Sequence, residues 1–205
     1  MKFINVRGCN GSGKTTLLRM LARDPLCRVE NVHVTHEYKD PKTKEKVRGY
    51  HAPIPVTYAP GGVAMLGDYT PGATGTTAGC DRIKTQEAAK NALEYIAQDP
   101  EVRVILFEGV VVSTIFGPWK EWAEANGGML WAFLDTPLEV CLDRIQKRNG
   151  GKPIKEELVG SKWRTINAVR KKAEKAGLPV EVIRWEAALL DGKALVRKVA
   201  AGEVQ

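Results

Sequence analysis

Histidine, cysteine and aromatic residues are scarce in this chain of 205 residues, which has 3 His, 4 Cys and 7% aromatics. The cysteines lie too far apart in sequence for metal-ligand spacing, which argues against a zinc site or a disulfide framework and favours a reducing compartment: Cys9, Cys27, Cys80 and Cys141. No stretch approaches the roughly 18 consecutive apolar residues of a membrane span, and residues 1–7 are too polar for a signal peptide. We therefore expect a soluble, cytoplasmic protein with no membrane partner.

Composition predicts a single globular domain over residues 1–205, with 43% hydrophobic and 27% charged residues. The net charge of +7 is unevenly distributed. Residues 144–175 contain 11 Lys or Arg and 3 Glu, a net of +8, whereas the rest of the chain holds 20 basic and 21 acidic residues. This block is suited to binding a polyanion, either nucleotide phosphates or a nucleic-acid backbone. The alternative is that it forms a solvated helix face with no ligand.

Strand and helix patterns alternate along most of the chain. Apolar runs predict strands at 2–7, 102–107, 129–134 and 180–183, and helical spacing of apolar residues predicts helices at 15–22, 85–98, 118–125, 138–148, 161–176 and 185–200. Such alternation predicts an α/β fold with a parallel sheet covered on both faces.

Residues 29–83 interrupt this alternation and read as an insertion. A β-hairpin is expected around the polar turn at residues 40–43, followed by a loop over residues 59–80 that contains six glycines. Loops of this length in compact domains are usually functional or disordered.

The segment between the first strand and the first helix matches the pattern G-x-x-x-x-G-K-[ST] at every fixed position. Glycines let the backbone fold around a phosphate with its N–H groups pointing inward, and the following helix N-terminus adds partial positive charge. Lys14 is expected to reach the β- and γ-phosphates of a nucleotide, and the Thr15 hydroxyl to bind Mg²⁺. The predicted nucleotide-binding residues are Gly8, Cys9, Asn10, Gly11, Ser12, Gly13, Lys14, Thr15 and Thr16.

Two carboxylates follow predicted strands at the edge where α/β sheets bind ligands. Glu108 comes directly after the strand at 102–107, and we expect it to hold the Mg²⁺ shell or orient the attacking group. Asp135 precedes Thr-Pro, which favours a structural role as the N-cap of the helix at 138–148. Trp185 and the other four tryptophans are scattered, and most are expected to be core or half-buried.

Arg144 and Arg148 lie four residues apart and project from one face of the predicted helix at 138–148. A glycine-bearing basic loop follows, and in nucleotide kinases this position holds a lid that closes over the phosphates. Residues 144–160 are therefore predicted to form a lid whose arginines stack on the adenine and stabilise the transferring group, although an exposed basic face is the simpler alternative.

The chain resembles the P-loop kinases built like nucleoside-monophosphate kinases. Three segments carry the resemblance, namely Gly8–Thr16, the strand ending at Glu108-Gly109, and residues 141–148. The resemblance implies a five-stranded parallel core, ATP and Mg²⁺. Residues 29–80 depart from that pattern, because ordinary nucleotide kinases have a helical substrate cap there.

A narrower resemblance is to bacteriophage DNA kinases that phosphorylate the hydroxymethyl group of 5-hydroxymethyluracil in DNA. It is carried by Met65-Leu66-Gly67-Asp68-Tyr69, by Gly79-Cys80-Asp81-Arg82-Ile83, and by the Glu-Gly pair at 108–109. The resemblance implies an ATP-dependent kinase acting on a DNA base in the host cytoplasm.

An alcohol acceptor benefits from a carboxylate that takes its proton. Asp81 is the preferred candidate for this base and Asp68 the second, with Tyr69 and Arg82 beside them on the substrate side. Tyr50, His51, Tyr58 and Tyr69 could form a base-stacking surface, although aromatic residues on a hairpin more often pack across strands. The alternatives left open are a kinase for free nucleotides or nucleosides and an ATP-hydrolysing switch.

Overall fold

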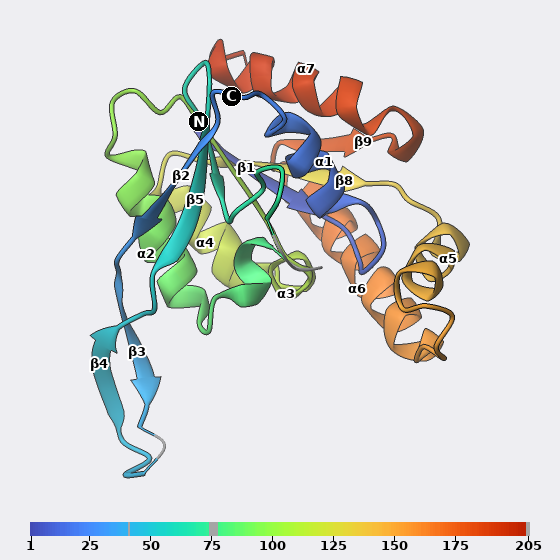
Figure 1. The fold of residues 1–205 in the computed structure, drawn as a ribbon, viewed down its shortest axis with the longest axis horizontal. Helices are drawn as coiled ribbons and strands as arrows, with labels where there is room; N and C mark the ends of the chain where they lie inside the picture. The colour runs from blue at the N-terminus through green and yellow to red at the C-terminus, as the bar shows by residue number, and fades with distance from the viewer. Residues whose placement is uncertain (41, 74–77, 204–205) are drawn as a thin grey trace.

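The fold is organised around one central β-sheet of seven strands (Figure 1). The computed structural model describes residues 1–40, 42–73 and 78–203. In spatial order the strands are β2 (Arg28–Val32), β5 (Ile54–Ala59), β6 (Val63–Leu66), β7 (Val104–Glu108), β1 (Phe3–Arg7), β8 (Met129–Leu134) and β9 (Val180–Ile183). The strands from β6 to β9 in this order run parallel, whereas β5 is antiparallel to both of its neighbours.

The sheet therefore has seven strands where five were expected. The additional strands come from the interrupting segment, because β2 and β5 extend the sheet on the β6 side. Residues 63–66, expected to belong to a glycine-rich loop, form β6 instead. This run of four apolar residues lies between glycines and is too short to reveal its periodicity, but pairing with β7 buries it.

The predicted hairpin is present, but it forms its own two-stranded sheet of β3 (Thr35–Lys39) and β4 (Lys46–Tyr50). Its turn is closed by Asp40, whose Oδ1 accepts hydrogen bonds from the backbone N–H groups of Lys42 (2.7 Å) and Thr43 (2.9 Å). Pro41, in the predicted turn, lies outside the described residues. Beyond the main sheet, β3 and β4 continue the course of β2 and β5 as a projecting arm (Figure 1).

Helices cover both faces of the sheet, as the α/β pattern predicts. On one face α1 (Lys14–Leu21) and α7 (Ala188–Ala200) pack on Ile4 and Val6, and on the other α2 (Gln86–Ala97), α4 (Gly117–Ala125) and α6 (Glu156–Lys175) pack around Phe3 and Phe107. The remaining helices are the short α3 (Val110–Thr114), which was not expected, and α5 (Leu138–Arg148). Helix α6 begins at Glu156 rather than at residue 161, because Glu156 and Glu157 in its first turn complement the helix dipole. No helix in the described ranges has the length and hydrophobicity needed to cross a membrane.

Strand direction places several loops at one edge of the sheet. Since β1, β7, β8 and β9 are mutually parallel, the residues that follow each of them meet at the carboxyl edge. Strand β2 points the same way, because it is antiparallel to β5, which is itself antiparallel to β6. The β3–β4 hairpin consequently projects from the carboxyl edge too.

Gly79 makes a close backbone approach at this edge. Its φ is +69°, and a Cβ there would lie 2.6 Å from the Glu108 carbonyl oxygen and 2.7 Å from the Tyr69 hydroxyl. Gly61, in the turn between β5 and β6, also has a positive φ of +83° but has no atom within 4 Å of an added Cβ. The two glycines share the backbone conformation and differ in the space around them.

We predict that Gly79→Ala destabilises the fold much more than Gly61→Ala. The left-handed backbone costs alanine about 1–2 kcal/mol at either site. At Gly79 the collision with the end of β7 adds to this and brings the loss above about 3 kcal/mol. Urea unfolding of both variants measures the difference, and equal losses would show that the contact between residue 79 and β7 is loose.

Candidate active site

The loop from Gly8 to Thr15 connects the end of β1 with the start of α1. Gly11 and Gly13 adopt positive φ values of 78° and 102°, which L side chains rarely adopt. At Gly11 an added Cβ would also lie 2.4 Å from the carbonyl oxygen of Cys141 on α5. The two glycines thus let the loop curl while α5 packs against it, and the first N–H groups of α1 have no partner within the helix. The curled loop and the unpaired N–H groups at the start of α1 together suit the binding of an anion.

Lys14 lies inside this curl. Its side chain is buried, and Nζ donates hydrogen bonds to the carbonyl oxygens of Gly8 (2.8 Å) and Cys9 (3.0 Å). These contacts hold the ammonium group against the first residues of the loop. A phosphate bound in the loop would therefore meet a positioned cation.

Glu108 is the buried acid of the site and has 1% of its surface exposed. Its Oε1 accepts hydrogen bonds from the hydroxyls of Thr15 (2.9 Å) and Tyr69 (3.4 Å). Burial raises the pKa of Glu108, while the nearby charge of Lys14 and the Thr15 hydrogen bond oppose that rise. This contact brings together the two residues predicted to hold Mg²⁺, and their role as its ligands stays a prediction.

The Thr15 and Glu108 oxygens suit a magnesium ion. Mg²⁺ takes oxygen ligands and is commonly held by one or two protein side chains together with substrate phosphates and water. Here a hydroxyl and a carboxylate lie side by side at the start of α1, next to the loop that fits an anion. Within the described ranges no three His, Cys, Asp or Glu side chains form a self-contained metal cluster, so a metal here would need the phosphates as additional ligands.

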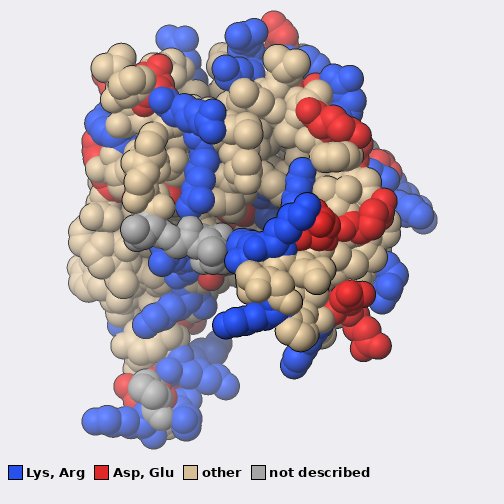
Figure 2. All heavy atoms as spheres, turned by 45° about the vertical axis from the view of Figure 1, so that its right-hand side comes forward, with Lys and Arg blue, Asp and Glu red and all other residues tan. Residues whose placement is uncertain are grey.

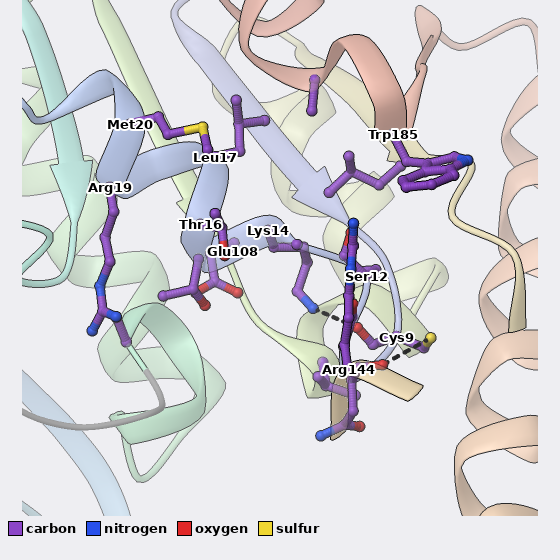
Figure 3. A pocket seen from close by; sticks show the side chains of 18 of the residues that line it. Cys9, Ser12, Lys14, Thr16, Leu17, Arg19, Met20, Glu108, Arg144 and Trp185 are labelled. Atoms are coloured by element: carbon purple, nitrogen blue, oxygen red, sulfur yellow. Dashed lines mark hydrogen bonds between the residues drawn. The ribbon is translucent and has the colours of Figure 1, made fainter. Parts of the chain in front are cut away.

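A cavity of about 660 Å³ opens over this arrangement (Figure 3). Arg144 and Trp185 lie on one side of it and Arg19 on the other, with Lys14 and Glu108 between them. The guanidinium of Arg144 lies 5.2 Å from the ring centre of Trp185, and its Nη1 donates to the carbonyl oxygens of Gly11 and Ser12 at 3.3 Å. The volume and the cationic lining suit a nucleotide.

Asp135 has a structural role, but not the expected one. It does not cap α5, whose N-cap residue is Pro137. Its Oδ1 instead accepts a hydrogen bond from the backbone N–H of Trp185 at 2.8 Å, and so fixes the residue that stacks on Arg144. The expected cap fails because Thr-Pro separates Asp135 from the first turn of α5.

Arg148 lines the same cavity from the last turn of α5 and is exposed. The following residues 149–155 form a loop in which Gly150 and Gly151 have φ values of 64° and 77°. Arg144 and Arg148 both line the cavity, and their roles toward a nucleotide stay predictions. Closure of residues 144–160 as a lid stays a prediction.

Of the acceptor-side candidates, Asp81 lines the cavity, whereas Asp68 is not among its lining residues. Asp81 accepts hydrogen bonds from the N–H groups of Val110 (2.8 Å) and Val111 (3.1 Å), so it caps α3, a helix that sequence reasoning did not anticipate. Asp68 closes a local turn by accepting from the N–H and hydroxyl of Thr70.

Tyr69 and Arg82 are not brought to the open cavity. Tyr69 is 1% exposed, so its predicted contact with substrate is wrong for this structure, and its ring instead lies behind Glu108. Arg82 ends the short 3₁₀ helix η1 (Gly79–Arg82) with an exposed side chain.

Among the lining residues that the sequence analysis did not assign to the site, Arg19 carries a charge and Trp185 an aromatic ring. Arg19 lies four residues after Thr15, a spacing that places both on one face of α1. Trp185 comes two residues after β9 ends at the carboxyl edge. The four-residue spacing from Thr15 and the position just after β9 both indicate the carboxyl edge, but neither residue belongs to the glycine-lysine motif.

Comparison with known proteins decides the family. A family model described as 5-hmdU DNA kinase matches residues 2–194. The chain belongs to the 5-hmdU DNA kinase family. It is 64% identical over 200 residues to the 5-hmdU DNA kinase of Pseudomonas phage M6, a match that covers 97% of this chain and 100% of that protein.

Two further members of the 5-hmdU DNA kinase family are more distant. The 5-hmdU DNA kinase 1 of Salmonella phage ViI is 32% identical, over 79% of this chain and 66% of that protein. The 5-hmdU DNA kinase of Bacillus phage SP10 is 33% identical, over 85% of this chain and 25% of that protein. Family membership confirms the narrower of the two resemblances and the enzyme class, a phosphotransferase.

We predict that Glu108→Gln stabilises the fold at pH 7.5 while it removes most of the kinase activity. Because burial raises the pKa of Glu108, the ionised carboxylate destabilises the folded state above its unfolded pKa of about 4.3, and an amide has no such charge. The gain should shrink as the pH falls, since the wild-type carboxyl is then protonated too. Urea unfolding at pH 7.5 and pH 5 checks this, and a variant less stable than wild type at both values would contradict it.

Proposed function

We propose that this protein transfers the γ-phosphoryl group of ATP to the hydroxymethyl oxygen of 5-hydroxymethyluracil in DNA. The observation that carries the proposal is the match to a phage 5-hmdU DNA kinase over that protein's whole length. The cavity supports it, because Lys14, Arg144 and Arg148 line one space together with the acids Glu108 and Asp81. Residues 1–205 then act as one kinase domain, with residues 29–83 on the acceptor side.

The donor nucleotide binds along the Gly8–Thr15 loop. Backbone N–H groups and Lys14 hold the β- and γ-phosphates, while Arg144 and Trp185 provide flat surfaces on one side of the cavity that suit the adenine. Arg148 enters with the lid at residues 144–160 and stabilises charge on the transferring group.

Thr15 and Glu108 are the residues that would hold Mg²⁺, directly or through its water shell. When bound, the ion neutralises charge on the β- and γ-phosphates. The Tyr69 hydroxyl steadies the Glu108 carboxylate from behind, since both Tyr69 and Thr15 donate to its Oε1.

Transfer forms one P–O bond and breaks another, and it moves one proton. The hydroxymethyl oxygen bonds to the γ-phosphorus as the bond between that phosphorus and the β,γ-bridging oxygen breaks, which releases ADP. The proton of the hydroxymethyl group goes to the Asp81 carboxylate, which lines the cavity and is held in place by the N–H groups at the start of α3. Because the acceptor is a base, it must leave the duplex stack or be presented in single-stranded DNA.

The direct test of this function is transfer of labelled phosphate from ATP to a panel of acceptors. DNA containing 5-hydroxymethyluracil should be labelled, while the same DNA containing thymine should not. Labelling of free nucleotides alone would favour a nucleotide kinase, and steady ATP hydrolysis without labelled acceptor would favour an ATP-driven switch.

Lys14→Ala should lower transfer by several orders of magnitude, because the cation on the β- and γ-phosphates is lost. Lys14 is buried, so circular dichroism and urea unfolding must show that the variant is folded. Lys193→Ala, an exposed lysine on α7, is the matched control and should retain wild-type turnover. A folded Lys14→Ala protein with wild-type turnover would remove the assignment of the loop.

Asp81→Asn should lower kcat by about 10²- to 10⁴-fold, the usual contribution of a positioned base. The KM for ATP should change little, since the residue belongs to the acceptor side. Asp68→Asn is the matched control, because Asp68 lies in a turn outside the cavity lining and its loss should leave kcat within a few-fold. The reverse pattern would assign the base to Asp68.

A further inference from the structure

The β3–β4 hairpin is a surface for which the catalytic site gives no use. It projects from the carboxyl edge of the sheet, the same edge as the cavity, and Figure 1 shows it on the side of the molecule away from α5 and the start of α6. The hairpin and the α5–α6 region therefore flank the open edge. Figure 2 shows Lys and Arg side chains on the projecting hairpin and around the central hollow of the same face.

One face of the hairpin is cationic and carries an exposed aromatic ring. The register pairs Thr35 with Tyr50, Glu37 with Arg48 and Lys39 with Lys46, and these pairs share a face because side chains alternate along a strand. Lys39, Lys46 and Arg48 are exposed, and Tyr50 has 81% of its surface exposed. Within the described strands Glu37 is the acid on this face, which leaves a net charge of +2.

The opposite face of the hairpin packs against α2. His36 Nδ1 lies 2.9 Å from the Thr85 hydroxyl at the start of α2, and Asn91 Nδ2 donates to the Thr35 carbonyl oxygen at 2.8 Å. His51 Nε2 accepts from the Lys84 N–H at 3.1 Å. The base of the hairpin is therefore fixed to the body, which holds the cationic face in a defined position relative to the cavity.

The other cationic surface, the block at residues 144–175, is divided by the fold. The last turns of α6, with Lys171, Lys172 and Lys175, lead into β9, which begins at the edge of the sheet opposite the cavity. DNA that presents a base to the cavity therefore lies at the other edge of the sheet from the last turns of α6. Arg144 and Arg148 line the cavity, and Arg170 of α6 lies beside Gly8, Cys9 and Ser12, so these parts of the block remain close to the site.

We propose that the β3–β4 hairpin docks the substrate DNA, with Lys39, Lys46 and Arg48 on phosphates beyond the two that adjoin the target nucleotide and Tyr50 against the exposed sugar or base beside them. This inference rests on the proposed function, which supplies DNA as the partner. The complementary charge and the aromatic ring on one fixed face suit a nucleic-acid backbone. The hairpin adds about 17 Å to the edge of the sheet, at about 3.3 Å per residue, which corresponds to about five nucleotides.

The test is the triple variant Lys39→Gln, Lys46→Gln and Arg48→Gln, assayed on long and short DNA containing one 5-hydroxymethyluracil. On a 30-mer its KM at 50 mM salt should rise about fiftyfold or more while kcat stays near wild type. On a trinucleotide, whose backbone reaches only one phosphate to either side, wild type and variant should have the same KM.

Salt dependence gives a second measurement. Three lost phosphate contacts should reduce the slope of log KM against log salt by about 2–3. Between 50 and 200 mM salt, wild type should therefore lose about 20- to 40-fold more affinity for the 30-mer than the triple variant does.

The matched control removes the same charge from the far end of α6 through Lys171→Gln, Lys172→Gln and Lys175→Gln, and should leave the KM for the 30-mer within about threefold. Tyr50→Ala, which retains every charge, should raise that KM without changing the salt slope. Equal effects of the two triple variants would overturn hairpin docking in favour of nonspecific charge, and so would a hairpin variant that behaves as wild type. If wild type labels no DNA, the proposed function fails instead.

Discussion

The parallel pairing of β1 with β7 on one side and β8 on the other is the constraint on which the site depends. It sends the Gly8–Thr15 loop, Glu108 and Asp135 to one edge of the sheet, although Glu108 lies 93 residues after Thr15 in the sequence. The 2.9 Å hydrogen bond from Thr15 to Glu108 is the most direct consequence. Through the antiparallel strands β2 and β5 the same constraint directs the hairpin to that edge as well.

Stability and function oppose each other at Glu108. A carboxylate buried to 99% destabilises the folded state unless neighbours compensate it, and here Lys14, Thr15 and Tyr69 do so in part. Tyr69 can approach because Gly79, which adopts a positive φ beside it, has no side chain. Packing behind Glu108 thus explains why position 79, in the glycine-rich segment 59–80, is a glycine.

Much of the parallel sheet and the position of the Gly8–Thr15 loop between β1 and α1 could be predicted from sequence, because buried strands are strongly apolar and the glycine-lysine motif has a fixed spacing. Strand β6 and the antiparallel edge could not, since four apolar residues between glycines do not identify their partner strand. The capping of α3 by Asp81 could not be predicted from the neighbouring sequence either, because it depends on a contact between residues 29 positions apart. Tyr69 was misplaced for the same reason, as its burial depends on Glu108.

The proposed function requires that one edge of the sheet bring the γ-phosphate of ATP to the hydroxyl of a DNA base. The most direct measurement uses ATP labelled with ¹⁸O on the γ-phosphate, a circular DNA containing 5-hydroxymethyluracil, and mass spectrometry of the nucleosides after digestion with nucleases that leave base modifications intact. The account predicts that the ¹⁸O-labelled phosphate is recovered on the hydroxymethyl oxygen of the base. Unmodified 5-hydroxymethyluracil, with all labelled phosphate released into solution, would contradict it.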